Sequence, residues 1–241
     1  MNIVDSIKAS ILTPIHPAGI PFIAIFFILT VIIGWFWAPL YFVGIILTVW
    51  CIYFFRNPSR VTPVLSGVNK NNLIISPADG RVIEISKINP SEDIGLPEGD
   101  WTRVCVFMNV FDVHVNRSPM LGQITYKNYI PGSFFNASLD KASSENERLI
   151  LGMETENGKK IAFVQIAGLV ARRIICDVDI GSSLKAGEIY GLIRFGSRVD
   201  IYFPSDVSIM VLQGQKMIAG ETIIGDFTKS SKSVKENLDE K

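Results

Sequence analysis

The chain has 241 residues, enough for one large domain or for one domain with an appendage. Its 23 basic and 23 acidic residues balance, and no segment concentrates lysine and arginine, so the composition argues against a nucleic-acid-binding protein. The three cysteines are an odd number and form no C-x-x-C pair, which argues against a disulfide framework and indicates a reducing compartment.

The first patterned segment of the chain is apolar. No charged residue occurs from 9 to 55, and residues 21–55 are almost wholly hydrophobic. As one straight helix this stretch would measure roughly 50 Å, against the roughly 30 Å of a bilayer's hydrocarbon core. Pro39, near its centre, would break the hydrogen bonds of such a helix. We therefore expect a hairpin of two short helices, at about 21–35 and 39–55.

Both ends of this hairpin would emerge on one side of a membrane. Lys8, Arg56 and Arg60 place that side in the cytoplasm, because basic residues prefer cytoplasmic loops. Each helix is short for a full span, so two crossings and a shallow hairpin both stay open. A buried hairpin in a soluble core is the alternative, but such helices normally show a polar stripe. We expect residues 1–60 to be a membrane-associating segment and linker, at the cytoplasmic face of the inner membrane.

After residue 60 the pattern changes to short alternating runs that are typical of β-strands. They occur at 81–86, 103–110, 122–130, 148–155, 160–168, 188–195, 198–204 and 207–212. The glycine and proline turns between them favour a mainly β sandwich or barrel over a parallel α/β sheet. Residues 61–227 are expected to form this domain. Residues 228–241 lack apolar periodicity and are expected to be a disordered tail.

One strand pattern, GLIRFGSRVDIYFP at 191–204, contains a Gly-Ser pair at its centre. Glycine weakens a strand interior and usually marks a bulge, a bend or a close backbone approach. Elsewhere, Asp79 lies in SPADG, and His114 lies in a stretch where it would share a strand face with Asp112 and Asn116. A carboxylate, an imidazole and a hydroxyl are the parts of a nucleophile and its base. Most Asp-Gly pairs are simple turns, however, and a lone histidine is more often structural than catalytic.

Taken together, these motifs resemble the phosphatidylserine decarboxylase family, in its short bacterial form. The resemblance covers nearly the full chain and is carried by IHPAGIPFI (15–23), YFFRNPSR (53–60), SPADG (76–80), FDVHVNRSP (111–119), YIPGSFFNASLDKASSENER (129–148) and FGSRVD (195–200). It implies a proenzyme that cuts itself between Gly196 and Ser197. The products would be a β subunit, 1–196, and an α subunit, 197–241, which stay associated.

The resemblance also implies the chemistry. Ser197 would become a covalent pyruvoyl group, so that neither a metal nor an external cofactor is needed. Its ketone would form a Schiff base with the amino group of phosphatidylserine, and loss of CO2 would give phosphatidylethanolamine for phospholipid biosynthesis.

The resemblance assigns roles to two further residues. Asp79 would orient or charge-balance a histidine, and His114 would handle protons. The family's longer form has two histidines three residues apart, and here the second position is Arg117, which cannot act as a base. Whether His114 acts in both steps, or whether a water or Asp79 replaces it in one, stays open.

A diacyl lipid leaves the bilayer only at a cost of about 0.8 kcal/mol per buried CH2, so the enzyme should act at the membrane surface. Two loops, 89–101 and 131–148, are long enough to be lids or binding segments. In the second, Phe134, Phe135 and Arg148 are candidates for contacting the bilayer and the substrate phosphate, with a mobile solvated loop as the equal alternative. His16, which also matches a family position, is expected to anchor the interface. A homo-oligomer stays open.

Parts of the sequence are compatible with three other functions. A membrane-anchored zinc peptidase needs about three protein ligands, often histidines, and the soluble part offers only His114. A biotinyl- or lipoyl-type carrier is suggested by GQKMIAGETIIG (214–225), but the usual context of a modified lysine is incomplete around Lys216. A serine hydrolase would use Ser197 directly, in an uncut chain.

Overall fold

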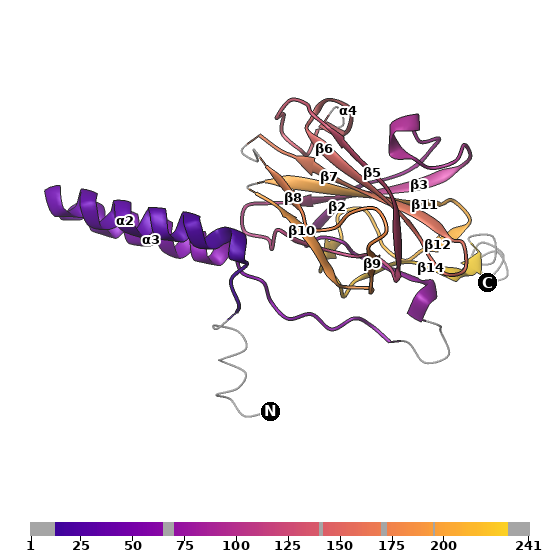
Figure 1. The fold of residues 1–241 in the computed structure, drawn as a ribbon, viewed down its shortest axis with the longest axis horizontal. Helices are drawn as coiled ribbons and strands as arrows, with labels where there is room; N and C mark the ends of the chain where they lie inside the picture. The colour runs from indigo at the N-terminus through magenta and orange to yellow at the C-terminus, as the bar shows by residue number, and fades with distance from the viewer. Residues whose placement is uncertain (1–12, 65–69, 140–141, 170–172, 195, 231–241) are drawn as a thin grey trace.

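The computed structural model describes residues 13–64, 70–139, 142–169, 173–194 and 196–230. A helical hairpin projects from one end of a β-rich domain (Figure 1). Its helices are α2 (Ile20–Phe36) and α3 (Pro39–Phe54), and the short 3-10 helix η1 (Pro17–Gly19) precedes them. The predicted hairpin is confirmed, with each helix end within one residue of the expected position.

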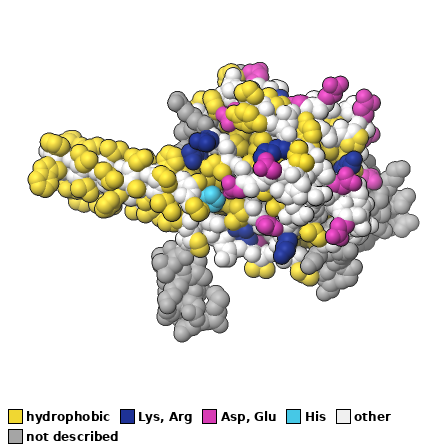
Figure 2. Space-filling model, viewed as in Figure 1, with side chains coloured by type: hydrophobic (Ala, Val, Ile, Leu, Met, Phe, Trp, Pro, Cys, Tyr) yellow, Lys and Arg dark blue, Asp and Glu magenta, His cyan; other side chains and the backbone are white. Residues whose placement is uncertain are grey.

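Small residues let the two helices approach closely. A Cβ atom at Gly44 would lie 2.4 Å from the Thr30 hydroxyl, and one at Gly34 would lie 2.6 Å from the Tyr41 ring. The remaining surface of the hairpin is covered by hydrophobic side chains (Figure 2). The stretch Pro17–Phe36 is long and apolar enough to cross a membrane, by length and composition, and α3 is a shorter apolar helix. The hairpin is therefore compatible with membrane association.

The strands form three antiparallel sheets. The main sheet has the order β13-β2-β3-β11-β7-β6-β5-β9. These strands are β2 (Gly80–Ile88), β3 (Trp101–Met108), β5 (Gly122–Ile130), β6 (Arg148–Glu154), β7 (Lys160–Ala167), β9 (Ser183–Leu184), β11 (Ser197–Pro204) and β13 (Lys216–Met217). The predicted strands from 81 to 168 all lie in this sheet.

Two small sheets, β1-β14-β12 and β4-β10-β8, complete the domain. Their strands are β1 (Leu73–Ile75), β4 (Val115–Arg117), β8 (Ile174–Cys176), β10 (Ile189–Ile193), β12 (Val207–Ile209) and β14 (Ile223–Ser230). Among the described residues, the domain also contains three short helices: η2 (Lys70–Asn72) before β1, and η3 (Glu92–Ile94) and α4 (Ala142–Glu145) between strands.

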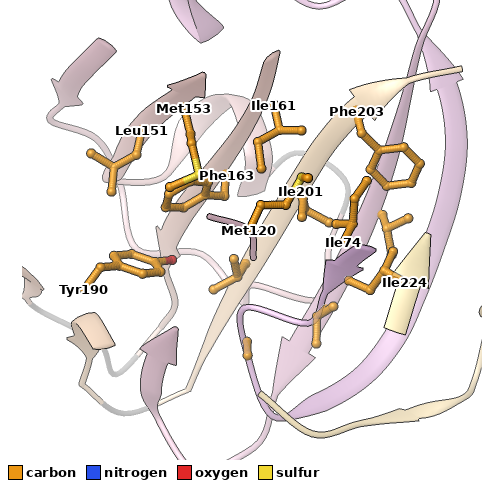
Figure 3. Packing of buried hydrophobic residues seen from close by; sticks show 14 of the residues in the cluster. Ile74, Met120, Leu151, Met153, Ile161, Phe163, Tyr190, Ile201, Phe203 and Ile224 are labelled. Atoms are coloured by element: carbon orange, nitrogen blue, oxygen red, sulfur yellow. The ribbon is translucent and has the colours of Figure 1, made fainter. Parts of the chain in front are cut away.

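The larger hydrophobic core lies where the main sheet faces the two small sheets (Figure 3). Phe163 and Ile201 of the main sheet pack there with Ile74 and Ile224 of one small sheet and with Tyr190 of the other. Each of these side chains is fully buried. The mainly β, sandwich- or barrel-like class predicted from the sequence is confirmed.

The opposite face of the main sheet is covered by the loop at 89–100. Ile94 of η3 packs there against Ile150, Val164 and Tyr202, which alternate along their strands with residues of the larger core. The loop predicted as a lid therefore closes a second, smaller core.

Two expectations differ in detail from the structure. β14 continues through Ser230, so the last strand ends beyond residue 228, where the tail was expected to begin. The rest of that tail, 231–241, lies outside the described residues. The segment expected as one loop at 131–148 contains α4 and ends on the first residue of β6, while 140–141 are not described.

Candidate active site

β11 begins at Ser197 and lies in the middle of the main sheet, between β3 and β7. Ser197 pairs with Met108 on one side and with Ala167 on the other. Its side chain is fully buried, and its hydroxyl donates to the thioether sulfur of Met108 at 4.0 Å. A thioether is a weak acceptor. The hydroxyl is therefore shielded from water without being held by a strong hydrogen bond.

Two glycines set the backbone geometry just before this serine. Gly196 has a φ of +68°, in the left-handed region that favours glycine. Its carbonyl oxygen lies against Gly168, where a Cβ atom would be only 2.2 Å away. Gly196 supplies the turn of the backbone, and Gly168 leaves the space for its carbonyl group.

His114 is held in one orientation beside this glycine. Its Nδ1 lies 3.1 Å from the Asp112 carbonyl oxygen, and its Nε2 lies 3.3 Å from the Gly196 nitrogen. Because a carbonyl only accepts and an N–H only donates, Nδ1 carries the proton and the Nε2 lone pair faces Gly196. The Phe54 ring of α3 packs on the imidazole, with 4.2 Å between ring centroids. Burial lowers the pKa of His114 to about 4, so this imidazole is neutral at pH 7.

A buried pair of amides continues the polar region from Met108 into the interior. Asn116 donates to the Met108 sulfur at 3.7 Å, and Gln165 donates to Asn116 at 2.8 Å. The Gln165 Oε1 atom is buried and has no partner within the described part of the chain. Sequence reasoning missed Gln165, although one amide at a core-facing position of the apolar run KIAFVQIAG was a usable signal.

The hairpin is attached to the same elements that hold His114. Phe54 and Phe55, at the end of α3, are fully buried against Val113, Val115 and Leu192, around the start of β4 and on β10. The candidate site is therefore built partly from the base of the hairpin.

Comparison with known proteins identifies the family of this chain. A model of the family described as phosphatidylserine decarboxylase matches residues 47–225. A curated relative from Ruegeria pomeroyi, named phosphatidylserine decarboxylase proenzyme, is 53% identical over 220 residues, which cover 91% of this chain and 98% of the relative. The chain belongs to the phosphatidylserine decarboxylase family. The family and the enzyme class expected from the sequence are thus confirmed.

Asp79, the acidic residue carried over from the family motif, contacts other partners than His114. It pairs with Arg60 at 2.7 Å and accepts from the backbone of Ala219 at 2.8 Å. Burial raises the pKa of Asp79, and Arg60 opposes that shift. In this structure the Asp112 carbonyl orients His114, and Asp79 ties the linker to the turn before β14. A catalytic role for Asp79 stays a prediction.

The structure separates Arg148 from Ser197. Arg148 aligns with Ile166, which aligns with Arg198, so these three side chains share one face of the main sheet. Ser197 alternates with Arg198 and points to the other face. Arg148 pairs with Asp93 at 2.9 Å, beside a cavity of about 610 Å³ on that far face.

The two phenylalanines of the family loop lie elsewhere. Phe134 is partly buried against the larger core. Phe135 exchanges backbone hydrogen bonds with the Asn146 side chain at 2.9 and 2.8 Å. Substrate binding by Arg148, Phe134 and Phe135 stays a prediction.

Arg117 and His16 have structural contacts. Arg117 donates to Asn57 and to the Pro58 and Gly187 carbonyls, each at 3.0 Å, and so fastens the linker to the domain. His16 caps η1 by accepting from Ala18 at 3.3 Å. Arg117 therefore fixes the linker relative to the β domain, whereas the His16 side chain acts locally at the start of η1.

The other interpretations find little support in the geometry. Within the described ranges, no group of three or more His, Cys, Asp or Glu side chains is arranged to hold a metal ion. Lys216 is an exposed residue of β13 that lies opposite Arg81 of β2, in an ordinary sheet pairing.

Proposed function

We propose that the chain decarboxylates phosphatidylserine to phosphatidylethanolamine and CO2 at a membrane surface, after cutting itself between Gly196 and Ser197. One observation carries this proposal: a buried serine hydroxyl follows a left-handed glycine, and that glycine faces the lone pair of a neutral histidine. The curated relative is named a proenzyme, which supports processing of the chain.

In the first step, the Ser197 Oγ attacks the carbonyl carbon of Gly196. The new C–O bond forms an ester as the bond from this carbon to the Ser197 nitrogen breaks. His114 Nε2 takes the hydroxyl proton and returns it to the departing nitrogen. Because burial lowers its pKa to about 4, His114 is unprotonated at pH 7 and its Nε2 lone pair is available to take that proton. Because Gly168 has no side chain, the attacked carbonyl has room to become tetrahedral.

Elimination then divides the chain. Loss of a proton from the Cα of residue 197 breaks its Cβ–O bond, which leaves a carboxylate on Gly196 and dehydroalanine at 197. Addition of water and loss of ammonia convert this residue into a pyruvoyl group at the start of the α subunit.

The surroundings of Ser197 fit such a group. Among the described residues, the Asn116 amide donates only to a weak thioether acceptor, so its N–H is available to hold a new carbonyl oxygen. The nearby Gln165 has an unpartnered buried oxygen, which is available to accept from an N–H or O–H donor. When formed, the pyruvoyl group supplies a ketone that condenses with an amine and accepts the electron pair released with CO2. His114 would carry the proton to the product carbon.

The two subunits should remain associated. β11 is hydrogen-bonded to β3 along its whole length and to β7 as far as Tyr202. Across the cut, the Arg198 guanidinium also donates to Cys105 at 2.8 Å. Separating the subunits would therefore require the middle of the main sheet to open.

Denaturing mass spectrometry of the purified chain tests this proposal. The wild type should give two pieces, 1–196 and 197–241, and the smaller should lack a free amino terminus. Ser197→Ala should stay in one piece, whereas Ser208→Ala, which alters another buried serine of the α subunit, should still be cut. Borohydride added with substrate should abolish CO2 release. Active enzyme with an unmodified Ser197 in a continuous chain would refute the proposal.

A further inference from the structure

The end of the β domain beside the hairpin exposes apolar side chains on two loops. Phe111 and Val110, between β3 and β4, are 62% and 36% exposed, and Leu169, just after β7, is 68% exposed. The first loop leads into His114, and the second begins at Gly168, beside the Gly196 carbonyl. These exposed apolar residues therefore flank the candidate site.

Arg56 holds the first loop at the base of the hairpin. Its guanidinium donates to the carbonyl oxygens of Tyr53 and Phe111, both at 2.7 Å, and lies 3.6 Å from the centre of the Tyr53 ring. Tyrosine near the end of an apolar helix is typical of a membrane interface. Phe111 is thus held at the level where α3 ends.

The same edge carries positive charge. Arg194 donates from its backbone to Arg173 at 3.4 Å, and its guanidinium lies 4.8 Å above the Phe22 ring of α2. Within the described residues, none of Arg56, Arg173 and Arg194 forms an ion pair. Figure 2 shows basic side chains on the domain beside the hairpin.

Three acidic residues lie near this edge. Asp79 and Asp112 are close enough to Arg56 to oppose the lowering of its pKa by burial, and Asp79 pairs with Arg60 at 2.7 Å. The Asp112 carboxylate accepts from the backbone of Asn109 at 2.9 Å, and Asp177 is close enough to His16 to oppose the lowering of its pKa by burial. Because Arg60 neutralises Asp79, the three arginines Arg56, Arg173 and Arg194 outnumber the two remaining acids, and this excess of positive charge suits the phosphate and carboxylate groups of anionic lipids.

We propose that Phe111, Val110, Leu169, Arg56, Arg173 and Arg194 form a membrane-docking edge that binds the surface of an anionic bilayer. Phe111 inserts among the lipid headgroups, and the arginines lie at the level of the phosphates. This places Phe111 and Leu169, which flank the site, at the lipid surface, so a headgroup can approach the site while the acyl chains stay in the bilayer. This inference rests on the proposed function, because it takes the substrate to be a membrane lipid.

Depth measurement with a nitroxide label tests the docking edge directly. Phe111→Cys would be labelled in full-length protein carrying Cys176→Ala, since the other two cysteines, Cys51 and Cys105, are fully buried. The control is Leu212→Cys, which replaces a 76% exposed leucine. It lies in the turn between β12 and β13, where the next residues, Gln213 and Gly214, donate to the carbonyls of Ile83 and Val82 on β2, outside the two loops of the docking edge.

In vesicles of phosphatidylcholine and phosphatidylglycerol, the label at 111 should collide with oxygen and be shielded from a water-soluble nickel chelate. The label at 212 should remain open to nickel. Equal nickel accessibility at both positions would overturn the proposal. Because this readout needs no catalysis, it is independent of whether the proposed function holds.

A kinetic comparison provides the second test. Phe111→Ser should lower the ratio of decarboxylation on vesicles to that on monomeric short-chain phosphatidylserine by about tenfold, the effect of losing one partly inserted aromatic ring. Leu212→Ser should leave this ratio unchanged. Arg173→Gln should lower it by about fivefold at low salt and less at high salt. An equal loss on both substrates for Phe111→Ser would contradict docking.

Discussion

Ser197 and Arg198 are neighbours on β11, yet they face opposite environments. The inner face around Ser197 contains a thioether, two amides and a neutral imidazole. The outer face contains a buried bidentate ion pair, in which Arg198 donates to Asp200 at 2.5 and 2.8 Å. Both members of this pair are fully buried.

This difference indicates that the two faces of β11 have different roles, one structural and one in the proposed reaction. Burial alone would lower the pKa of Arg198, but Asp200 raises it above its ordinary value, so the guanidinium stays charged. If it lay beside His114, the Asp200 carboxylate would raise the pKa of the imidazole and so favour its protonated form, whereas the proposed reaction needs the neutral form. Alternation along the strand keeps the charged pair on the structural side and the uncharged groups on the reactive side.

Removing the imidazole from the inner face should have the largest effect, and this effect is on the rate of self-cleavage. His114→Ala removes the group that faces Gly196, and self-cleavage should slow by about 10³-fold, as expected for loss of a general base. The measurement is the rate at which the full-length band disappears after synthesis. His16→Ala, which changes only the cap of η1, should be cut at nearly the normal rate. A His114→Ala rate within a few-fold of the wild type would exclude this role.

Removing one partner of the ion pair on the outer face should lower the stability of the fold instead. Asp200→Ala leaves the Arg198 charge buried without a partner, and the free energy of unfolding should fall by about 3–5 kcal/mol. Denaturant unfolding would be measured in the uncut Ser197→Ala background, so that one chain unfolds. Replacing both residues, as Arg198→Met with Asp200→Leu, should cost much less. If the single change cost no more than the double one, the ion pair would not have the assigned role.

The buried imidazole on the inner face should also make the stability of the fold depend on pH. The pKa of His114 is about 4 in the folded chain and ordinarily 6.5, so the unfolded chain binds this proton first as the pH falls. The free energy of unfolding should therefore be unaffected by this group above pH 6.5. It should fall as the pH is lowered toward 4, by about 3 kcal/mol in total. Unfolding in the Ser197→Ala background should therefore depend more steeply on pH than in the same background with His114→Gln. Identical pH profiles would contradict the assignment.

A smaller effect is expected where the hairpin contacts the inner face. Phe54→Leu keeps an apolar side chain but loses the ring against His114, and self-cleavage should slow by about tenfold, the equivalent of roughly 1.4 kcal/mol for one aromatic contact. The pH midpoint of cleavage should also rise, because a more hydrated imidazole is protonated more easily. Phe36→Leu, at the 83% exposed tip of α2, is the control and should change neither quantity.

Local sequence patterns determined most of the secondary structure of this protein and one feature of its candidate site. The uncharged apolar run and Pro39 predicted the two helices, and period-two alternation predicted the strands of the main sheet. The Gly196-Ser197 pair stood out because glycine and a hydroxyl interrupt that alternation. Each of these signals depends on residues within a few positions of one another.

The tertiary structure decided which distant residues meet. Gly196 contacts His114 and Gly168, and Gln165 lies beside Asn116, because β11 pairs with β7 while β10 pairs with β4, each in one register. A shift of one residue would have moved Arg148 to the side of Ser197, so the sequence alone could not place it. Asp79 likewise matched a family motif, but its partner Arg60 is set by the path of the linker. Composition and periodicity fix local structure, whereas the face and neighbours of each side chain depend on strand register across the whole domain.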